Sequence, residues 1–289
     1  MTIAPELTAA DLIHPGWEAP PNVRAFVTTR DGGVSEPPFG RWTAGGEGSD
    51  SGEGRELPGG LNLGRLSGDD LECVEANRAR LIDYAGVPAA WLKQVHGAGV
   101  VDAREALEAA RANDPISADA SVTDRPGIAC TVMVADCMPV LLCDGAGRAV
   151  GAAHAGWRGL AAGVVERTAQ RVSVLAGCAP HELHAYLGPA IGPAAFEVGE
   201  DVRDAFMTHA SAVAGAQRDA TAAAFVARPG MPGKYLADLG ALARLRLAAL
   251  GVERVSGGDL CTYTQRDRFY SYRRDRVTGR MAALVWIKP

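Results

Sequence analysis

Two histidines and one cysteine in the middle of the chain are the residues whose types best suit chemistry. His96 lies in the sequence QVHG, Cys137 in ADCMP and His154 in AHAGWRG. Imidazole nitrogens and a thiolate are good ligands for zinc, and three protein ligands leave one coordination position open for water or substrate. The three residues therefore predict an enzyme with a catalytic metal site, provided that the fold brings them together.

The spacing of the three residues does not by itself define a metal site. His96 and Cys137 are 41 positions apart (137 − 96) and Cys137 and His154 are 17 apart (154 − 137), so they form no local metal-binding loop. A cysteine or histidine in such surroundings is more often a packed core residue than a ligand. Arg158 favours a functional role for the residues around His154. The flanking glycines allow the backbone to approach other groups closely, and the guanidinium of Arg158 can bind phosphate or carboxylate.

The elements around these residues alternate between strands and helices. Cys137 follows a short apolar run, His154 ends another, and His96 lies in a glycine-flanked turn, so all three lie where side chains can enter a shared cleft. Apolar runs predict strands at 23–29, 128–135, 140–143, 149–154, 183–187 and 281–287, and helical patterns cover 70–84, 160–175, 198–209 and 236–250. This order predicts an α/β (α+β) fold with a substantial mixed sheet flanked by helices.

Composition excludes several classes of protein. The 289 residues carry a formal net charge of −5 without a long Lys/Arg run, which argues against nucleic acid as a partner and leaves a small anionic group as a possible ligand. No stretch of 18 apolar residues predicts a membrane span, and the first residues do not resemble a secretion signal. Six scattered cysteines without a CxxC pair favour reduced thiols. We expect a cytoplasmic monomer that does not bind membranes.

One segment differs from this globular pattern. Residues 43–60 are rich in Gly, Ser and Glu and contain no apolar periodicity. They follow the strand predicted at 23–29 and precede the sequence LNLG at 61–64. We therefore interpret 43–60 as a flexible insertion loop within a single domain that spans 1–289.

The motifs that contain the three candidates resemble the YfiH-like family, which is also called the laccase-domain or polyphenol oxidase family and the peptidoglycan editing factor group. The resemblance rests on QVHG at 94–97, ADA at 118–120, DCMP at 136–139 and HAGWRG at 154–159, and on TTRDGGVS at 28–35, LNLG at 61–64, NR at 77–78, LGPAI at 187–191, FYSYRR at 269–274 and TGR at 278–280. Motifs in this order cover most of the chain, from about 23 to 287. The insertion at 43–60 departs from the compact family pattern and concerns one rim of the site.

The resemblance implies a single layered α/β domain and one zinc ion bound at the positions of His96, Cys137 and His154. It also implies action on purine nucleosides, in which phosphate cleaves the glycosidic bond of adenosine, inosine or methylthioadenosine, and in some members deamination of adenosine. The expected partners are thus a nucleoside and phosphate. As catalytic residues we take the three ligands and Arg158.

Three further residues are candidates for substrate binding. Arg30, Asn62 and Arg273 lie in sequence motifs of the resemblance and could contact phosphate or ribose through hydrogen bonds. Each could instead be structural, since Arg30 and Asn62 could hold turns and Arg273 could belong to a solvated pair with Arg274. Asp136 is a candidate to orient a metal ligand by a hydrogen bond.

Copper could take the place of zinc. A multicopper laccase needs a trinuclear cluster with many histidine ligands, and the chain has six histidines, of which two are already assigned. A single copper centre with Met133 or Met138 as a further ligand stays open. A metal-free hydrolase with Cys137 as nucleophile and His154 as base also stays open, as does an editing factor that acts on UDP-linked peptidoglycan precursors.

Overall fold

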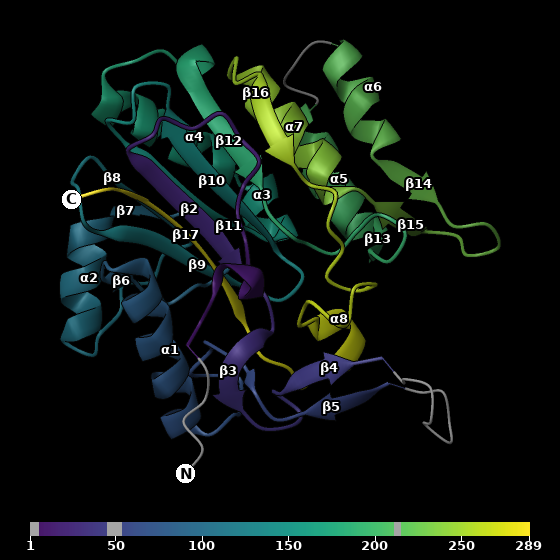
Figure 1. The fold of residues 1–289 in the computed structure, drawn as a ribbon. Helices are drawn as coiled ribbons and strands as arrows, with labels where there is room; N and C mark the ends of the chain where they lie inside the picture. Colours follow the sequence, from purple (N-terminus) through teal and green to yellow (C-terminus); the bar gives the residue numbers. More distant parts are fainter. Residues whose placement is uncertain (1–5, 45–53, 211–214) are drawn as a thin grey trace.

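Two β-sheets packed face to face form the centre of the molecule (Figure 1). The computed structural model describes residues 6–44, 54–210 and 215–289. The first sheet has the order β1-β2-β17-β9-β6 and the second the order β16-β12-β10-β11-β8-β7. Their strands are β1 (Leu12–Ile13), β2 (Val23–Thr28), β6 (Ala89–Ala90), β7 (Val100–Asp102), β8 (Ala120–Thr123), β9 (Ala129–Val134), β10 (Met138–Asp144), β11 (Val150–Ala155), β12 (Leu183–Leu187), β16 (Arg254–Gly257) and β17 (Met281–Ile287).

Both sheets mix parallel and antiparallel pairs. In the six-stranded sheet, β10 pairs antiparallel with β11 and β12, whereas β12–β16 and β7–β8 are parallel. In the five-stranded sheet, β17 pairs antiparallel with β2 and β9, and β6 runs parallel to β9. The prediction of a mixed α/β fold with helices on the outside is therefore confirmed.

The central strands are buried on both faces because apolar side chains point alternately to two cores. On β10, Leu141 and Cys143 pack between the sheets, while Val140 and Leu142 face the helices. Side chains alternate across a strand, so a strand covered on both faces must be apolar at every position. This explains why the predicted strands here appear as continuous apolar runs.

Helices cover the two outer faces. α4 (Val164–Ala176) packs on the six-stranded sheet beside α7 (Leu239–Ala249), and α1 (Leu71–Ala85) packs on the five-stranded sheet through residues such as Leu81. The remaining helices are α2 (Ala103–Arg111), α3 (Trp157–Ala161), α5 (Glu200–Ala210), α6 (Gly215–Ala223) and α8 (Tyr272–Asp275), with 3₁₀ turns η1 (Ala9–Asp11) and η2 (Pro180–Glu182).

Smaller strand groups lie outside the two main sheets. β13 (Glu197–Gly199), β15 (Lys234–Ala237) and β14 (Phe225–Ala227) form a three-stranded sheet beside α5 and α6. β4 (Arg41–Thr43) pairs with β5 (Arg55–Leu57), and β3 (Asp31–Ser35) precedes them. In Figure 1 the β4–β5 hairpin lies next to α8.

The structure corrects several predicted boundaries. The helix predicted over 160–175 is two helices, because Gly163 with φ of 89° separates α3 from α4. The helices predicted over 198–209 and 236–250 each begin with residues of a strand, β13 and β15. The loop predicted over 43–60 contains β5, whose backbone pairs with β4 although its side chains bury little. Positions 45–53 of that predicted loop lie outside the described residues.

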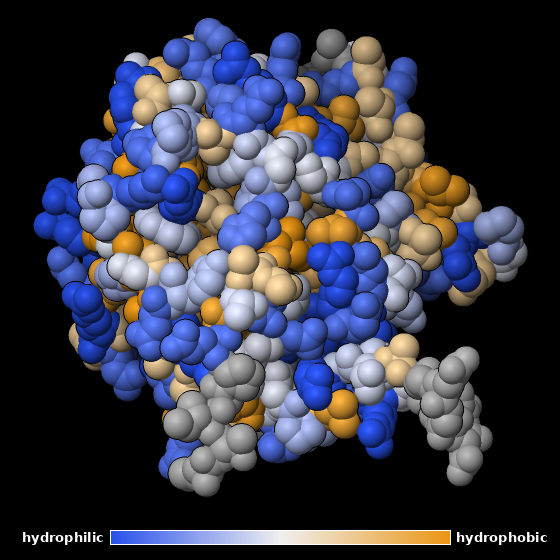
Figure 2. Space-filling view, in the orientation of Figure 1, coloured by the Kyte–Doolittle hydropathy of each residue, from blue (hydrophilic) through white to orange (hydrophobic). Residues whose placement is uncertain are grey.

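Hydrophilic residues predominate on the face shown in Figure 2, and hydrophobic residues appear there in separate small groups. In the part of the chain that the structure describes, no helix is long and apolar enough to cross a membrane. All six cysteines are free thiols. These features agree with the composition of the sequence.

Candidate metal centre and active site

The structure brings His96, Cys137 and His154 together. Their ligand atoms all lie within 4.8 Å of one another, and the two imidazole rings are 4.8 Å apart between centroids. His154 is buried in β11, Cys137 is half-buried in the turn between β9 and β10, and His96 is exposed in the turn after β6. A thiol and two imidazoles at this spacing are a suitable ligand set for one transition-metal ion.

Asp119 holds the two histidines in place. Its Oδ1 lies 2.9 Å from Nδ1 of His154, and its two oxygens accept hydrogen bonds from the backbone N–H groups of Val95, His96 and Gly97 at 3.2, 2.8 and 2.7 Å. A carboxylate at Nδ1 leaves Nε2 of His154 available for a metal. One side chain therefore orients one ligand directly and fixes the turn that carries another.

Asp119 is suited to this role because it stays ionised. Burial alone would raise the pKa of its carboxyl group, but the hydrogen bonds from His154, Gly97 and His96 outweigh burial and lower the pKa. Asp136, predicted to orient a metal ligand, accepts hydrogen bonds from Thr262, Ser271 and Arg273 and from neither histidine. It therefore does not orient an imidazole by a hydrogen bond.

The turn that carries His96 is also tied to β9. The side-chain amide of Gln94 donates to the carbonyl of Met133 at 2.8 Å and accepts from the Met133 backbone N–H at 2.7 Å. These bonds continue the pairing of the sheet beyond its edge strand, and they support His96, whose φ of 60° is uncommon for a non-glycine residue. Gln94 therefore has a structural role beside a metal ligand.

Glycines make room for the three ligands. A Cβ atom at Gly156 would lie 2.8 Å from Sγ of Cys137 and 3.1 Å from Cδ2 of His96, and a Cβ at Gly159 would lie 2.7 Å from the carbonyl oxygen of Gly97. Contacts this short would force the ligands apart. The close approach predicted for this glycine pair is therefore present, and the cradle at Gly156 fits a metal held by the three residues.

Cys137 and His154 each favour the charged form of the other. Burial opposes ionisation of Cys137, but the nearby imidazoles of His154 and His96 prevail and lower the pKa of the thiol to about 6. Burial likewise opposes the charge on His154, yet Cys137 and Asp119 raise its pKa to about 9. The site thus favours a thiolate, the form of cysteine that binds a metal or attacks a substrate.

The three ligands line a cavity of about 1390 Å³. Its walls come from α1, α2, the ends of β9 and β11, and the C-terminal segment around α8. Arg158 and Arg273, which the sequence predicts as catalytic and substrate-binding residues, line this cavity together with five arginines that were not predicted. Those five are Arg65, Arg78, Arg111, Arg276 and Arg280. The cavity is therefore cationic although the chain as a whole carries a negative charge.

Two predicted substrate contacts do not line the cavity. Arg30 is completely buried, and its guanidinium donates to the backbone carbonyls of Gly40 and Arg266. Asn62 is also completely buried, and its Oδ1 accepts from the backbone N–H of Arg280 at 2.8 Å. Both residues hold turns, so the prediction that they bind substrate is corrected. Asn62 instead helps to place Arg280.

The two methionines considered as copper ligands have different contacts. Met138 is buried on the helical side of β10 near Gly240. Sδ of Met133 lies 3.6 Å from Nη2 of Arg78 at the cavity wall. The structure therefore gives no support for either sulfur as an axial ligand.

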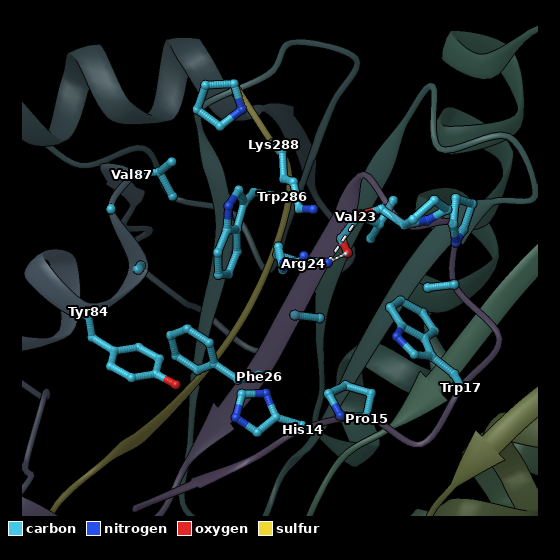
Figure 3. A pocket seen from close by; sticks show the side chains of 17 residues that line it. His14, Pro15, Trp17, Val23, Arg24, Phe26, Tyr84, Val87, Trp286 and Lys288 are labelled. Carbon is cyan, nitrogen blue, oxygen red and sulfur yellow. Dashed lines mark hydrogen bonds between the residues drawn. The ribbon is translucent and has the colours of Figure 1, made fainter. Parts of the chain in front are cut away.

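A second cavity, of about 660 Å³, lies where α1 ends (Figure 3). Arg24 and Lys288 lie between Trp286 and Trp17 there, and Phe26 packs edge-on against Trp286. The guanidinium of Arg24 donates to the carbonyls of Pro21 and Val23. None of the predicted site residues lines this cavity. His96, Cys137, His154, Arg158 and Arg273 all line the first cavity instead.

Residues 24–288 match the family described as multi-copper polyphenol oxidoreductase laccase. The chain therefore belongs to this laccase-like, YfiH-like family, as its motifs predicted. It is 48% identical over 280 residues to a purine nucleoside phosphorylase of Pseudomonas aeruginosa, a match that covers 96% of this chain and 98% of the relative. It is also 48% identical over 278 residues to the purine nucleoside phosphorylase YfiH of Escherichia coli K12, with the same coverage.

Solved structures agree with the fold. A crystal structure of a Neisseria meningitidis protein superimposes with a TM-score of 0.80 at 46% identity and covers 96% of this chain and 100% of its own. The structure of YlmD from Geobacillus stearothermophilus gives the same TM-score at 28% identity, with 98% coverage of both chains. The layered α/β arrangement is thus shared with these proteins.

Proposed function

We propose that the protein is a zinc-dependent purine nucleoside phosphorylase that acts on adenosine, inosine and methylthioadenosine. The proposal extends to deamination of adenosine in the same cavity. The names of the relatives support phosphorolysis, and the His96–Cys137–His154 group supports one bound metal ion. The observation that carries the proposal is that the buried Arg78 and the half-buried Arg280 line the same cavity as these three residues.

Arg78 has the surroundings of an anion-binding residue. It is 6% exposed, its Nε donates to the carbonyl of Leu63 at 2.9 Å, and its guanidinium lies 4.1 Å from the ring centroid of Trp91. Burial lowers its pKa to about 10, and the charge of Arg65 adds to this effect. A buried cation is costly unless an anion compensates it. Phosphate would supply that anion.

Arg280 provides a second cation close to the metal ligands. Its Nη1 donates to the carbonyls of Thr278 and Gly279. Burial lowers its pKa, whereas the charges of Cys137 and Asp136 counteract that change. Among the residues that the structure describes, neither Arg78 nor Arg280 forms an ion pair with a carboxylate. We therefore assign phosphate to the space between these two guanidinium groups and Cys137.

Three aromatic side chains that line the cavity suit a purine. Phe196, Tyr272 and Trp157 line the cavity, and the guanidinium of Arg273 lies 5.5 Å from the ring centroid of Phe196. Flat apolar rings next to cations favour stacking of an aromatic base and hydrogen bonds to its edge. We place the base on this side and the ribose between the base and the guanidinium groups of Arg78 and Arg280.

In the proposed reaction, the bond between C1′ of the ribose and the purine nitrogen breaks, and a bond forms between C1′ and a phosphate oxygen. The electron pair of the broken bond leaves with the purine, which takes up a proton, and the attacking hydrogen phosphate gives up one as it becomes the sugar phosphate. The arginines position the phosphate and stabilise its charge, as does Arg158 from α3. A bound zinc ion would polarise an oxygen atom or activate a water, which suits deamination.

A metal-free cysteine hydrolase is the second candidate function. The observation that favours it is that Sγ of Cys137 and a ring nitrogen of His154 lie within 4.8 Å of each other, since His154 lowers the pKa of the thiol and could act as its base. Metal content distinguishes the two candidates. One zinc ion per chain that protects Cys137 from alkylation supports the phosphorylase. An active protein without stoichiometric metal and with a readily alkylated thiol supports the hydrolase.

The proposal also covers the cellular location, the oligomeric state and the partners of the enzyme. We place it in the cytoplasm, where reduced thiols persist, as a monomer with nucleoside and phosphate as its partners. Incubation with each nucleoside, with and without phosphate, followed by chromatography of base and sugar phosphate, tests the activity. Assay of UDP-linked peptidoglycan precursors in parallel tests for an editing factor. Turnover of these precursors alone, without release of purine base, would reject the phosphorylase.

A further inference from the structure

Asp136, the residue before Cys137, connects three segments that are distant in the sequence. Its Oδ1 accepts hydrogen bonds from the hydroxyls of Thr262 and Ser271, both at 2.7 Å, and its Oδ2 accepts from the backbone N–H of Arg273 at 2.6 Å. Its backbone carbonyl accepts from the N–H of Ile191 at 2.9 Å. Asp136 therefore links the β9–β10 turn by hydrogen bonds to residue 191 and to residues 262–273.

The backbone of Asp136 is in an unusual conformation. Its φ is 101°, a region that residues other than glycine rarely adopt, and only 9% of the residue is exposed. Such a conformation is costly and persists where surrounding contacts require it. Here the hydrogen bonds of the carboxylate are those contacts. The same turn directs Cys137 towards His96 and His154.

The segment held by Asp136 forms one wall of the cavity. We call residues 262–276 the C-terminal arm; it includes α8. Tyr272, Arg273 and Arg276 of the arm line the cavity. Arg274 holds the arm together internally, because its guanidinium donates to the carbonyls of Thr262, Tyr263 and Phe269.

The arm is also linked to the segment that carries Phe196. The guanidinium of Arg273 donates to the carbonyl of Glu197 at 3.0 Å, which places it beside the aromatic wall proposed for the base. The arm therefore joins the metal ligand on one side, through Asp136, to the proposed base site on the other.

We propose that Asp136 is a positioning residue that couples the metal ligand Cys137 to the C-terminal arm. Metal binding fixes Cys137 and thereby the turn at Asp136, so the arm becomes better ordered and presents Tyr272 and Arg273 to the substrate. The kinetic part of this inference rests on the proposed function. Coupling is reciprocal, so a ligand that orders the arm also tightens metal binding.

Two substitutions separate coupling from folding. Asp136→Gly removes the three side-chain hydrogen bonds and retains a residue that adopts a φ of 101° without strain. Asp136→Asn retains an oxygen acceptor and a residue that tolerates positive φ, so it should restore part of the coupling. Ser271→Ala removes one of the three bonds from the arm itself. None of these changes alters a proposed metal ligand.

Hydrogen exchange with zinc alone tests the coupling without any assay of turnover. In the unsubstituted protein, zinc should slow amide exchange in the arm by about tenfold, the effect of roughly 1.4 kcal/mol. Asp136→Gly should still bind one zinc ion per chain and should lose the zinc-dependent protection of the arm, with strands β10 and β17 unchanged. Asp136→Asn should lie between the two. The proposal is overturned if zinc protects the arm equally in Asp136→Gly, or does not protect it in the unsubstituted protein.

Kinetics then address the role in catalysis. If the protein is a phosphorylase, Ser271→Ala should raise KM for the nucleoside by about tenfold, the effect of one lost hydrogen bond to a charged group. Asp136→Gly, which loses three such bonds, should raise this KM further. KM for phosphate should stay nearly constant, because Arg78 and Arg280 lie outside the arm. An equal rise of both KM values would contradict the positioning role. Absence of turnover in the unsubstituted protein would reject the proposed function and leave the exchange result valid.

Discussion

Oδ1 of Asp119 lies 2.9 Å from Nδ1 of His154 and also accepts the backbone N–H of His96 at 2.8 Å, so one carboxylate positions two candidate metal ligands. Partners of this kind typically contribute a factor of about 10–100 to metal affinity. We expect Asp119→Asn to weaken zinc binding by about that factor, measured by competition with a chromophoric chelator. Asp124→Asn, at an exposed position just after β8, is the control. Equal zinc affinity in both variants would show that Asp119 has no such role.

Gly156→Ala should impair the metal site with little effect on the fold. The backbone at Gly156 has φ of −65° and ψ of 159°, which alanine adopts readily, but the added Cβ would meet Sγ of Cys137 at 2.8 Å. We expect zinc affinity to fall by at least about tenfold, because metal ligands tolerate only small displacements. Gly16→Ala, where a Cβ would meet nothing within 4 Å, is the matched control. A variant with full zinc affinity would argue against metal binding by this group.

Arg78→Gln and Arg280→Gln should affect phosphate more than the nucleoside. Loss of a charge-assisted hydrogen bond costs about 1.5–3 kcal/mol, so KM for phosphate should rise about 10–100-fold in each variant. Steady-state kinetics with either substrate varied will measure the two KM values. The exposed Arg167 on α4 provides a control substitution outside the cavity. A larger effect on the nucleoside than on phosphate would place the anion elsewhere.

Asp31→Asn should stabilise the protein in a pH-dependent way. Burial raises the pKa of Asp31 to about 6 against the attraction of Arg30 and Arg41, and its Oδ1 has no hydrogen-bond partner. The folded state therefore binds the proton more tightly than the unfolded state, and this carboxyl group destabilises the fold increasingly as the pH rises from about 4 to above 6. The group is partly exposed, so we expect a modest gain in Tm for the variant at about pH 7.5, about 1–3 °C.

The gain should disappear at a pH of about 4 or below, where Asp31 is protonated in both states and carries no charge. Thermal melts of both proteins across this range, without added metal, give the difference in Tm at each pH. A constant difference, or a loss of Tm at neutral pH, would contradict the raised pKa. The metal site is not involved, because Asp31 does not line its cavity.

Much of the site was predictable because its residues lie in compact motifs. Apolar runs placed the strands before Cys137 and up to His154, and the glycines around Trp157 predicted close packing. Arg78 could also have been recognised, since it lies four residues after Val74 and three before Leu81 on the buried stripe of α1. A cation on a core-facing stripe indicates a specific role.

The remaining parts depend on contacts between distant segments. The sequence offers no means of deciding that His154 meets Asp119 and not Asp136, because Asp136 is adjacent to Cys137 whereas Asp119 lies 18 positions before it (137 − 119). Arg30 and Asn62 resembled substrate contacts, but the fold buries them under turns. The strands β13 and β15 were assigned to helices because short strands that precede a helix share its apolar pattern. The interpretation of 1–289 as a single domain stays a prediction.

Phosphorolysis itself is the most direct test of the proposed function. Purified zinc-loaded protein is incubated with inosine, with and without phosphate, and hypoxanthine and ribose 1-phosphate are quantified by chromatography, with Cys137→Ala as the inactive reference. We predict equal amounts of base and sugar phosphate that require phosphate and are absent with Cys137→Ala. Base release that is independent of phosphate, or no base release from inosine, adenosine or methylthioadenosine, would contradict the proposal.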